Sequence, residues 1–93
     1  MIKLNDEYIV EYDELKNKLD ALTEKAKSES PVQVGDIAVD EQGNEYLIRE
    51  LRIDWTYGFI KVDKISRKKK NGEWDSRAID RINVRGYLQL KKQ

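Results

Sequence analysis

A stripe of apolar residues with helical spacing occupies the first third of the chain. It is formed by Leu15, Leu19, Leu22 and Ala26. Intervals of four, three and four residues place these side chains on one face of an α-helix. Asp13 is a suitable N-cap, and the helix is expected to end by about Ser28, because the residue before Pro31 avoids the α conformation.

Residues 1–12 fit two interpretations. Extended backwards, the stripe includes Tyr8 and Tyr12, which gives a heptad pattern in one long helix. The run Tyr8-Ile9-Val10, however, is rich in strand-forming residues, and Asn5-Asp6 is typical of a turn. We favour a short N-terminal hairpin followed by the helix. For the assembly, a monomer and a weak homodimer through the N-terminal helix both stay open.

After Pro31 the apolar positions change from helical to alternating spacing. The predicted strands are Ile37–Val39, Glu45 to about Asp54, Phe59 to about Ser66, about Glu73 to Ile79, and Gly86–Leu90. Asn71-Gly72 is a strong hairpin turn between the third and fourth of them. Arg49 interrupts the alternation of the second strand, which predicts a bulge near Arg49-Glu50. Five short strands of this kind indicate a small antiparallel barrel.

A short motif opens the strand region. Val34-Gly35-Asp36 precedes the first predicted strand, and a turn containing Gly43 leads into the second. This stretch resembles the opening of SH3-like barrels of the KOW and Tudor kind, and Gly58–Val62 and Tyr87–Leu90 are compatible with the same barrel over residues 32–90. The resemblance implies a binding module for nucleic acids, peptides or larger protein assemblies.

A chain of 93 residues is expected to form a single domain with a modest core. Residues 1–30 are assigned to the N-terminal hairpin and helix segment, and residues 31–93 to the SH3-like barrel. The expected class is α+β, with the N-terminal helix packed on the five-stranded antiparallel barrel.

Histidine and cysteine are absent from the sequence. Their absence excludes disulfides, thiol nucleophiles, Cys/His zinc sites and histidine-dependent catalysis. No EF-hand spacing and no Gly-rich phosphate loop before a helix is present. We therefore expect a protein that is not an enzyme and needs no cofactor or metal. The longest strictly apolar runs have three residues, which predicts no membrane span and a cytoplasmic location.

The charges balance over the whole chain but not along it. Residues 1–30 carry five basic and eight acidic side chains, residues 31–63 three and seven, and residues 64–93 ten and three. If these segments stay apart in the fold, they form an acidic and a basic face that would steer a charged partner. If the strands interleave, the charges neutralise each other across the sheet.

An aromatic ridge is the first candidate contact surface. Trp55, Tyr57 and Phe59 share one strand parity and are followed by Lys61. Exposed aromatic rings beside a cation suit base stacking or a protein hot spot. The alternative interpretation is that two of the three rings close one end of the barrel core.

A basic hairpin is the second candidate. Its members are Arg67, Lys68, Lys69, Lys70, Trp74 and Arg77. Four consecutive cations near a tryptophan suit nucleic-acid phosphates or an acidic protein groove. The alternative is a solvated loop whose lysines protect a sheet edge from aggregation.

These features predict a non-enzymatic module that recruits or inhibits a macromolecular protein partner. A short, highly charged chain without cysteine also resembles the small accessory and host-takeover proteins of bacterial viruses. The second hypothesis is a nucleic-acid-binding module that uses the basic hairpin and the aromatic ridge. The net charge of zero counts against it, because nucleic-acid-binding domains are usually basic.

Overall fold

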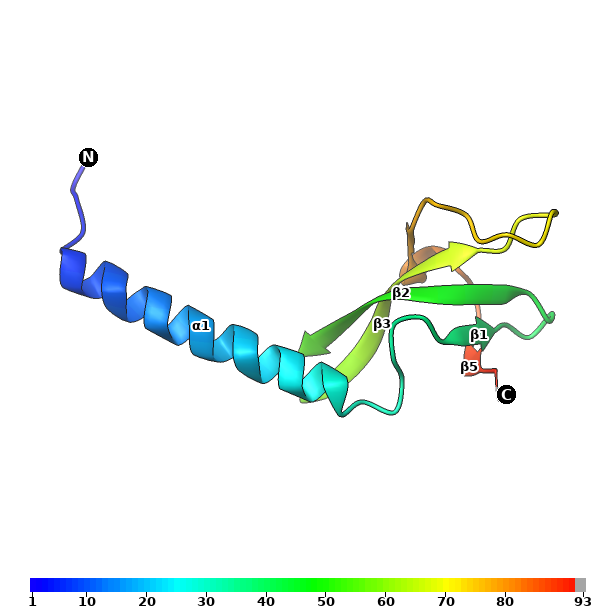
Figure 1. The fold of residues 1–93 in the computed structure, drawn as a ribbon, viewed down its shortest axis with the longest axis horizontal. Helices are drawn as coiled ribbons and strands as arrows, with labels where there is room; N and C mark the ends of the chain where they lie inside the picture. The colour runs from blue at the N-terminus through cyan, green and yellow to red at the C-terminus, as the bar shows by residue number, and fades with distance from the viewer. Residues whose placement is uncertain (92–93) are drawn as a thin grey trace.

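A long N-terminal helix projects from an antiparallel sheet in the computed structural model, which describes residues 1–91 (Figure 1). The elements are the helix α1 (Asp6–Ser28), the strands β1 (Ile37–Val39), β2 (Glu45–Asp54), β3 (Phe59–Arg67), β4 (Ile79–Asp80) and β5 (Gln89–Leu90), and the 3₁₀ helix η1 (Arg81–Asn83). The molecule measures 55 × 29 × 21 Å along its principal axes, because α1 extends beyond the sheet. The predicted α+β class is confirmed.

The helix α1 begins earlier than the favoured prediction. Asn5 is its N-cap, and the Asn5 Oδ1 accepts a hydrogen bond from the backbone N–H of Glu7 at 2.9 Å. Asp6 and Glu7 place negative charge at the positive end of the helix dipole. The N-terminal hairpin expected within residues 1–12 is therefore wrong, and the single long helix is right. Its end at Ser28 agrees with the prediction.

The prediction that this helix packs on the sheet is wrong for most of its length. None of residues 6–28 is buried, and Leu19 is 49% exposed. Only the last turns, where Ala26 and Lys27 are half-buried, approach β2. Val32, in the segment after the helix, and Leu88 pack against the sheet core instead.

The sheet has the strand order β4-β3-β2-β1-β5, and every neighbouring pair is antiparallel. After β4, η1 and the following segment carry the chain from one edge of the sheet to the other, where β5 pairs with β1. Within residues 1–91, β4 and β5 do not pair with each other. The sheet is open, so the predicted closed barrel is not confirmed.

The long β2–β3 hairpin forms the centre of the sheet. Its register shifts between Ile48 and Glu50 and again before Leu51, which confirms the bulge predicted near Arg49. The predicted bounds of β2 and the start of β3 are confirmed. The predicted strand from Glu73 is instead mostly irregular, and β4 contains only two residues. The last predicted strand is likewise reduced to two residues, β5.

The hydrophobic core lies on one side of β1, β2 and β3. Its buried members are Ala38, Tyr46, Ile48, Leu51, Ile65 and Val84. Ile48 and Ile65 are direct partners across the β2–β3 ladder, and both are almost fully buried. Ser66, the next residue of β3, is buried on the opposite side of the strand, and its Oγ donates a hydrogen bond to the carbonyl of Arg77 at 3.4 Å. The segment after β3 is thereby fixed to the sheet.

Candidate functional site

The aromatic ridge lies at the turn between β2 and β3 rather than along one extended strand. Trp55 and Tyr57 lie in the turn, and Phe59 opens β3 opposite Asp54. Asp54 shapes this turn, because its Oδ1 accepts the N–H of Tyr57 at 3.0 Å and its carbonyl accepts the N–H of Gly58 at 2.8 Å. Gly58 has a φ of +71°, a left-handed conformation that glycine adopts without strain.

All three side chains of the aromatic ridge are exposed. The exposed fractions are 49% for Trp55, 78% for Tyr57 and 48% for Phe59. The rings of Tyr57 and Phe59 stack, with centroids 6.4 Å apart and an angle of 24° between their planes. Lys61 is exposed and shares a side of β3 with Phe59, since alternate strand residues point the same way. The interpretation that two of the rings close the core is wrong.

The basic hairpin continues β3 beyond its last ladder residue. Lys68 pairs with Trp74 in an isolated bridge, and the N–H of Lys69 donates to the carbonyl of Glu73 at 2.7 Å. Gly72 has a φ of +89°, so the predicted Asn71-Gly72 turn is confirmed. The hairpin lies at the end of the molecule farthest from α1 (Figure 1).

Lys68 is engaged within the fold. Its Nζ lies 3.3 Å from Oε2 of Glu45 and 5.6 Å from the ring centroid of Trp74. Lys91 approaches the other oxygen of Glu45, with an Nζ–Oε1 distance of 2.7 Å. The hydrogen bond from Lys91 and then that from Lys68 hold the pKa of Glu45 below its ordinary value. Lys68 therefore connects the basic hairpin to the start of β2, and Trp74 contacts Lys68 within the hairpin.

Other cations of the basic hairpin extend into solvent. Lys69 and Lys70 are exposed, and within residues 1–91 neither forms an ion pair. With Arg67 they border a shallow hollow of about 480 Å³ beside the β1–β2 turn. Arg77 is also exposed, and its backbone N–H donates to Oδ1 of Asp75 at 2.9 Å. Within residues 1–91, Arg67 and Arg77 form no ion pair either, so the hairpin presents four unpaired cations, with Lys69 and Lys70 at its tip.

The two candidate surfaces do not meet. The nine residues of β3 separate the aromatic ridge from the basic hairpin, a length of about 26 Å for an extended strand. The acidic and basic segments of the sequence, in contrast, do meet, since Glu45 lies between Lys68 and Lys91. Charges are therefore partly neutralised across the sheet, as the sequence predicted for strands that interleave.

The β1–β2 turn is organised by one carboxylate. Oδ1 of Asp40 accepts the backbone N–H groups of Gln42 and Asn44, both at 2.9 Å. Oδ2 accepts from Nδ2 of Asn44 at 3.0 Å and from the hydroxyl of Tyr46 at 2.9 Å. Burial raises the pKa of Asp40, but these four hydrogen bonds outweigh it and hold the pKa below its ordinary value. Burial, and then the bond to Asp40, raise the pKa of Tyr46.

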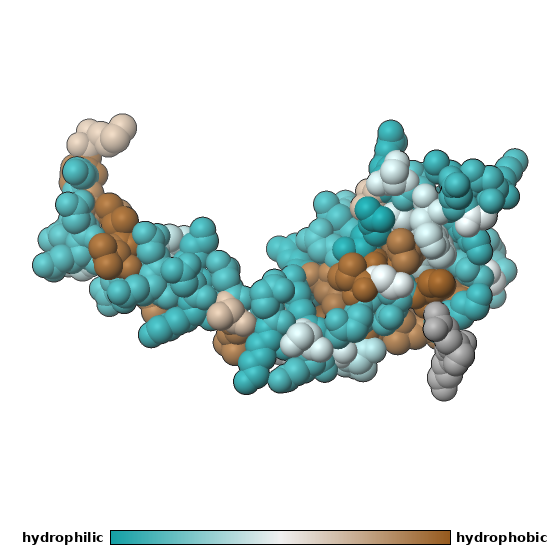
Figure 2. Space-filling view, viewed as in Figure 1, coloured by the Kyte–Doolittle hydropathy of each residue, from teal (hydrophilic) through white to brown (hydrophobic). Residues whose placement is uncertain are grey.

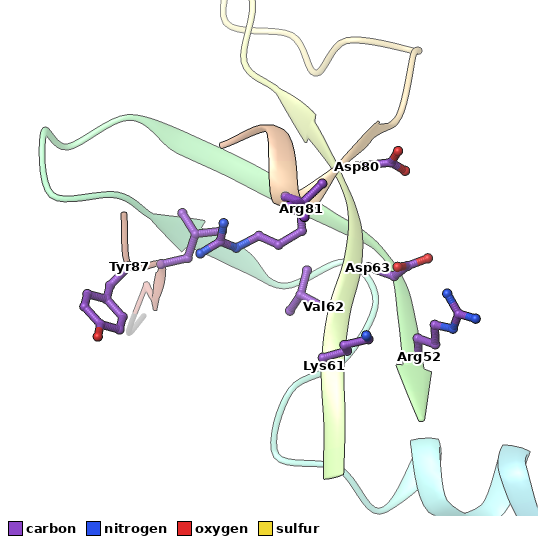
Figure 3. Close-up of a pocket in the computed structure, with 9 residues that line it drawn as sticks. Arg52, Lys61, Val62, Asp63, Asp80, Arg81 and Tyr87 are labelled. Carbon is purple, nitrogen blue, oxygen red and sulfur yellow. The ribbon is translucent and has the colours of Figure 1, made fainter. Parts of the chain in front are cut away.

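Sequence reasoning missed a groove of about 750 Å³ beside β3 (Figure 3). Arg81 crosses the groove, and its guanidinium donates to the carbonyls of Val84 at 2.8 Å and Gly86 at 2.7 Å. Ile82 and Tyr87 line the groove with 87% and 82% of their surface exposed. Its residues come from β2, β3, β4, η1 and the segment before β5, so no local sequence signal identifies it. The two hydrogen bonds of Arg81 hold η1 against the segment that leads to β5.

No protein family model, curated protein or solved structure matches the chain. Within residues 1–91, no helix combines the length and apolar character needed to cross a membrane. The same residues contain no group of three or more carboxylates placed to hold a metal ion.

Proposed function

We propose that the protein is a non-enzymatic binding module that recruits or inhibits a protein partner through the aromatic ridge. The observation that carries this proposal is the exposure of Trp55 together with the stacked pair of Tyr57 and Phe59. Tryptophan and tyrosine are enriched among the residues that dominate protein interfaces. Three exposed aromatic residues in one short turn are the largest concentration of such side chains on the sheet portion of residues 1–91.

The local structure favours binding by this turn. The two hydrogen bonds accepted by Asp54 and the stacking of the rings hold the turn in one arrangement before a partner arrives. Preorganisation lowers the conformational entropy lost on binding. Lys61 adds a positive charge beside Phe59, which favours a partner with acidic groups around an apolar patch.

The topology supports the same class of function. A five-stranded antiparallel sheet in which β5 returns to β1 supports the resemblance of residues 32–90 to SH3-like barrels. Many modules with that architecture bind peptides or proteins, although architecture alone does not assign a function. We place the activity in the cytoplasm, in an accessory role of the kind that small phage proteins perform.

The test compares affinity capture by the wild-type chain and by the variant Trp55→Ala/Tyr57→Ala. Proteins captured by the wild type should be lost with the variant, and a binding titration with the identified protein should show a loss of roughly 30-fold or more. Tyr87→Ala removes an aromatic side chain as exposed as Tyr57 but outside the turn, in the segment before β5, and is the matched control. Equal capture by all three proteins would contradict the proposal.

Nucleic-acid binding is the second candidate, and the free cations Lys69 and Lys70 favour it. The affinity for a labelled oligonucleotide should fall with salt, with a slope of about −0.7 to −0.9 per phosphate contact. Lys69→Ala/Lys70→Ala should then flatten this slope by nearly two units. Lys68→Ala should contribute less, because Lys68 is engaged with Glu45 and Trp74. Lys18→Ala, which removes an exposed lysine of α1, is the control and should leave the slope unchanged. If Lys69→Ala/Lys70→Ala also left the slope unchanged, the lysines of the loop would serve to protect the sheet edge from aggregation.

A further inference from the structure

The helix α1 exposes a row of apolar and aromatic side chains to solvent, and the face of α1 seen in Figure 2 shows separate apolar patches between hydrophilic surface. The stripe consists of Tyr8, Tyr12, Leu15, Leu19 and Leu22, with exposed fractions between 49% and 65%. It continues to Ala26, the position at which the sheet begins to cover the helix. From Tyr8 to Ala26 the stripe is about 27 Å long. Single exposed apolar residues are ordinary, but five large ones on the same face of one helix indicate an interaction surface.

This stripe has no partner within residues 1–91 other than the contact near its last turns. In proteins most of the stability of a helix comes from packing of its apolar face, yet no residue of the 23-residue α1 is buried. The long exposed α1 is therefore best explained as one half of an interface. The question is which partner covers it.

The spacing of the stripe identifies a second helix as the partner. The intervals of four, three, four, three and four residues are those of a heptad repeat. Tyr8, Leu15 and Leu22 occupy d positions, and Tyr12 and Leu19 occupy a positions. A membrane surface fits poorly, because α1 carries seven acidic and four basic side chains, whereas helices that bind anionic membranes are rich in lysine and arginine. A repeat of this period instead predicts knobs-into-holes packing against another helix.

We propose that α1 forms a parallel two-stranded coiled coil with a second copy of this chain. In such a dimer each a or d residue faces the same residue of the other copy, which gives five core layers from Tyr8 to Leu22. The residues beside the core are complementary in this orientation. Glu11 occupies a g position and faces Lys16, which occupies the following e position of the other copy. The two-fold symmetry of the dimer forms this ion pair twice. Lys18 faces the neutral Thr23.

The antiparallel orientation is less favourable for the same residues. In an antiparallel pair, e positions face e positions and g positions face g positions. With full overlap of the stripes, Glu11 faces Lys25 twice, but Lys16 also faces Lys16 and Lys18 faces Lys18 of the other copy. The antiparallel pair therefore has as many attractive contacts as the parallel pair and two repulsive contacts in addition. Like charges beside the core weaken a coiled coil, so the charge pattern selects the parallel arrangement.

Sedimentation of the full-length chain over micromolar to millimolar concentrations tests the dimer. The wild type should show a concentration-dependent mass of two chains. Leu19→Asp should shift it to the mass of one chain, because it places a charge in the core. Val10→Asp is the matched control, since Val10 is 58% exposed and lies at an f position, opposite the stripe. The melting transition of the sheet, followed by tryptophan fluorescence, should be retained in both variants.

Three results would overturn the dimer. In the first, the wild type stays monomeric at every concentration. In the second, the control Val10→Asp dissociates as readily as Leu19→Asp. In the third, the monomer binds anionic vesicles through the stripe. The orientation has its own test, because the chain lacks cysteine. Under mild oxidation with diamide, Tyr8→Cys should give a disulfide-linked dimer and Val10→Cys should not. Efficient cross-linking only in a mixture of Tyr8→Cys with Ala26→Cys would show an antiparallel pair and contradict the parallel arrangement.

Discussion

Single side chains fix the loops of this protein by accepting or donating several hydrogen bonds at once. Asp40 accepts four hydrogen bonds in the β1–β2 turn, and Arg81 donates to two carbonyls across the groove. Lys68 contacts both Glu45 and Trp74. These residues lie outside the long β2–β3 ladder, where less of the backbone is paired and side chains satisfy more of the polar groups.

The hydrogen bonds of Asp40 predict acid sensitivity. The pKa of Asp40 is below its ordinary value in the folded protein, so the folded state binds fewer protons than the unfolded state. The charged carboxylate of Asp40 therefore stabilises the folded state at pH values above the pKa of the unfolded chain. This stabilisation is lost as the pH falls through the lower pKa of the folded state. The pKa of Glu45 is lowered as well, so Glu45 has the same effect. Melting temperature should therefore fall as pH is lowered from about 6 to about 3.

Asp40→Asn isolates the charge in this experiment. The variant should melt at a lower temperature than the wild type at neutral pH and should lose less stability on acidification, because its side chain no longer titrates. Asp20→Asn, which changes an exposed acid on α1, is the control and should follow the wild-type curve. Parallel curves for Asp40→Asn and the wild type would show that the turn contributes nothing to acid sensitivity.

At the scale of elements, local patterns predicted the structure where the chain pairs with its sequence neighbours. The strand β2 and the start of β3 follow from alternation, and the bulge follows from the single break at Arg49. The predicted strand after Asn71-Gly72 is mostly irregular because local side chains pair with its backbone. Asn71 accepts the N–H of Glu73 and Asp75 accepts the N–H of Arg77, which competes with ladder formation.

Residues 1–12 were compatible with both a hairpin and a long helix for a physical reason. Asparagine and aspartate favour both turns and helix N-caps, so Asn5-Asp6 is compatible with a hairpin and with the start of α1. The aromatic ridge was identified from sequence, but its position at a turn was not, because Gly58 ends the extended conformation. The groove crossed by Arg81 depends on long-range contacts between five segments and has no local pattern.

The difference between the core and the helix stripe predicts contrasting stability effects. Ile65 is fully buried opposite Ile48, so Ile65→Ala should lower the free energy of unfolding by about 2–5 kcal/mol. Leu19 is 49% exposed and outside the sheet core, so Leu19→Ala should leave the urea unfolding of the sheet unchanged at concentrations where the chain is monomeric. Equal losses in the two variants would mean that α1 packs on the sheet after all.

For the whole molecule, the position of α1 determines how a dimer would present its surfaces. The C-terminal turns of α1 adjoin β2, so a parallel coiled coil would carry both sheets at the same end. Each sheet contributes one aromatic ridge. A dimer would therefore offer two copies of the proposed binding surface to one multivalent target, and the second contact would form at a high effective concentration.

This arrangement predicts avidity, and the prediction rests on both the proposed function and the proposed dimer. On a surface densely coated with the captured partner, the wild type should dissociate at least about 10²-fold more slowly than the monomeric Leu19→Asp variant. On a sparse surface, where only one ridge binds, the two should dissociate at the same rate. Surface plasmon resonance at two coating densities measures both dissociation rates.

Trp55→Ala is the control for the single contact and should weaken binding at either density, because it acts on each ridge separately. If Leu19→Asp matched the wild type on the dense surface while Trp55→Ala still lost affinity, the aromatic ridge would bind its partner and the dimer would play no part in that binding.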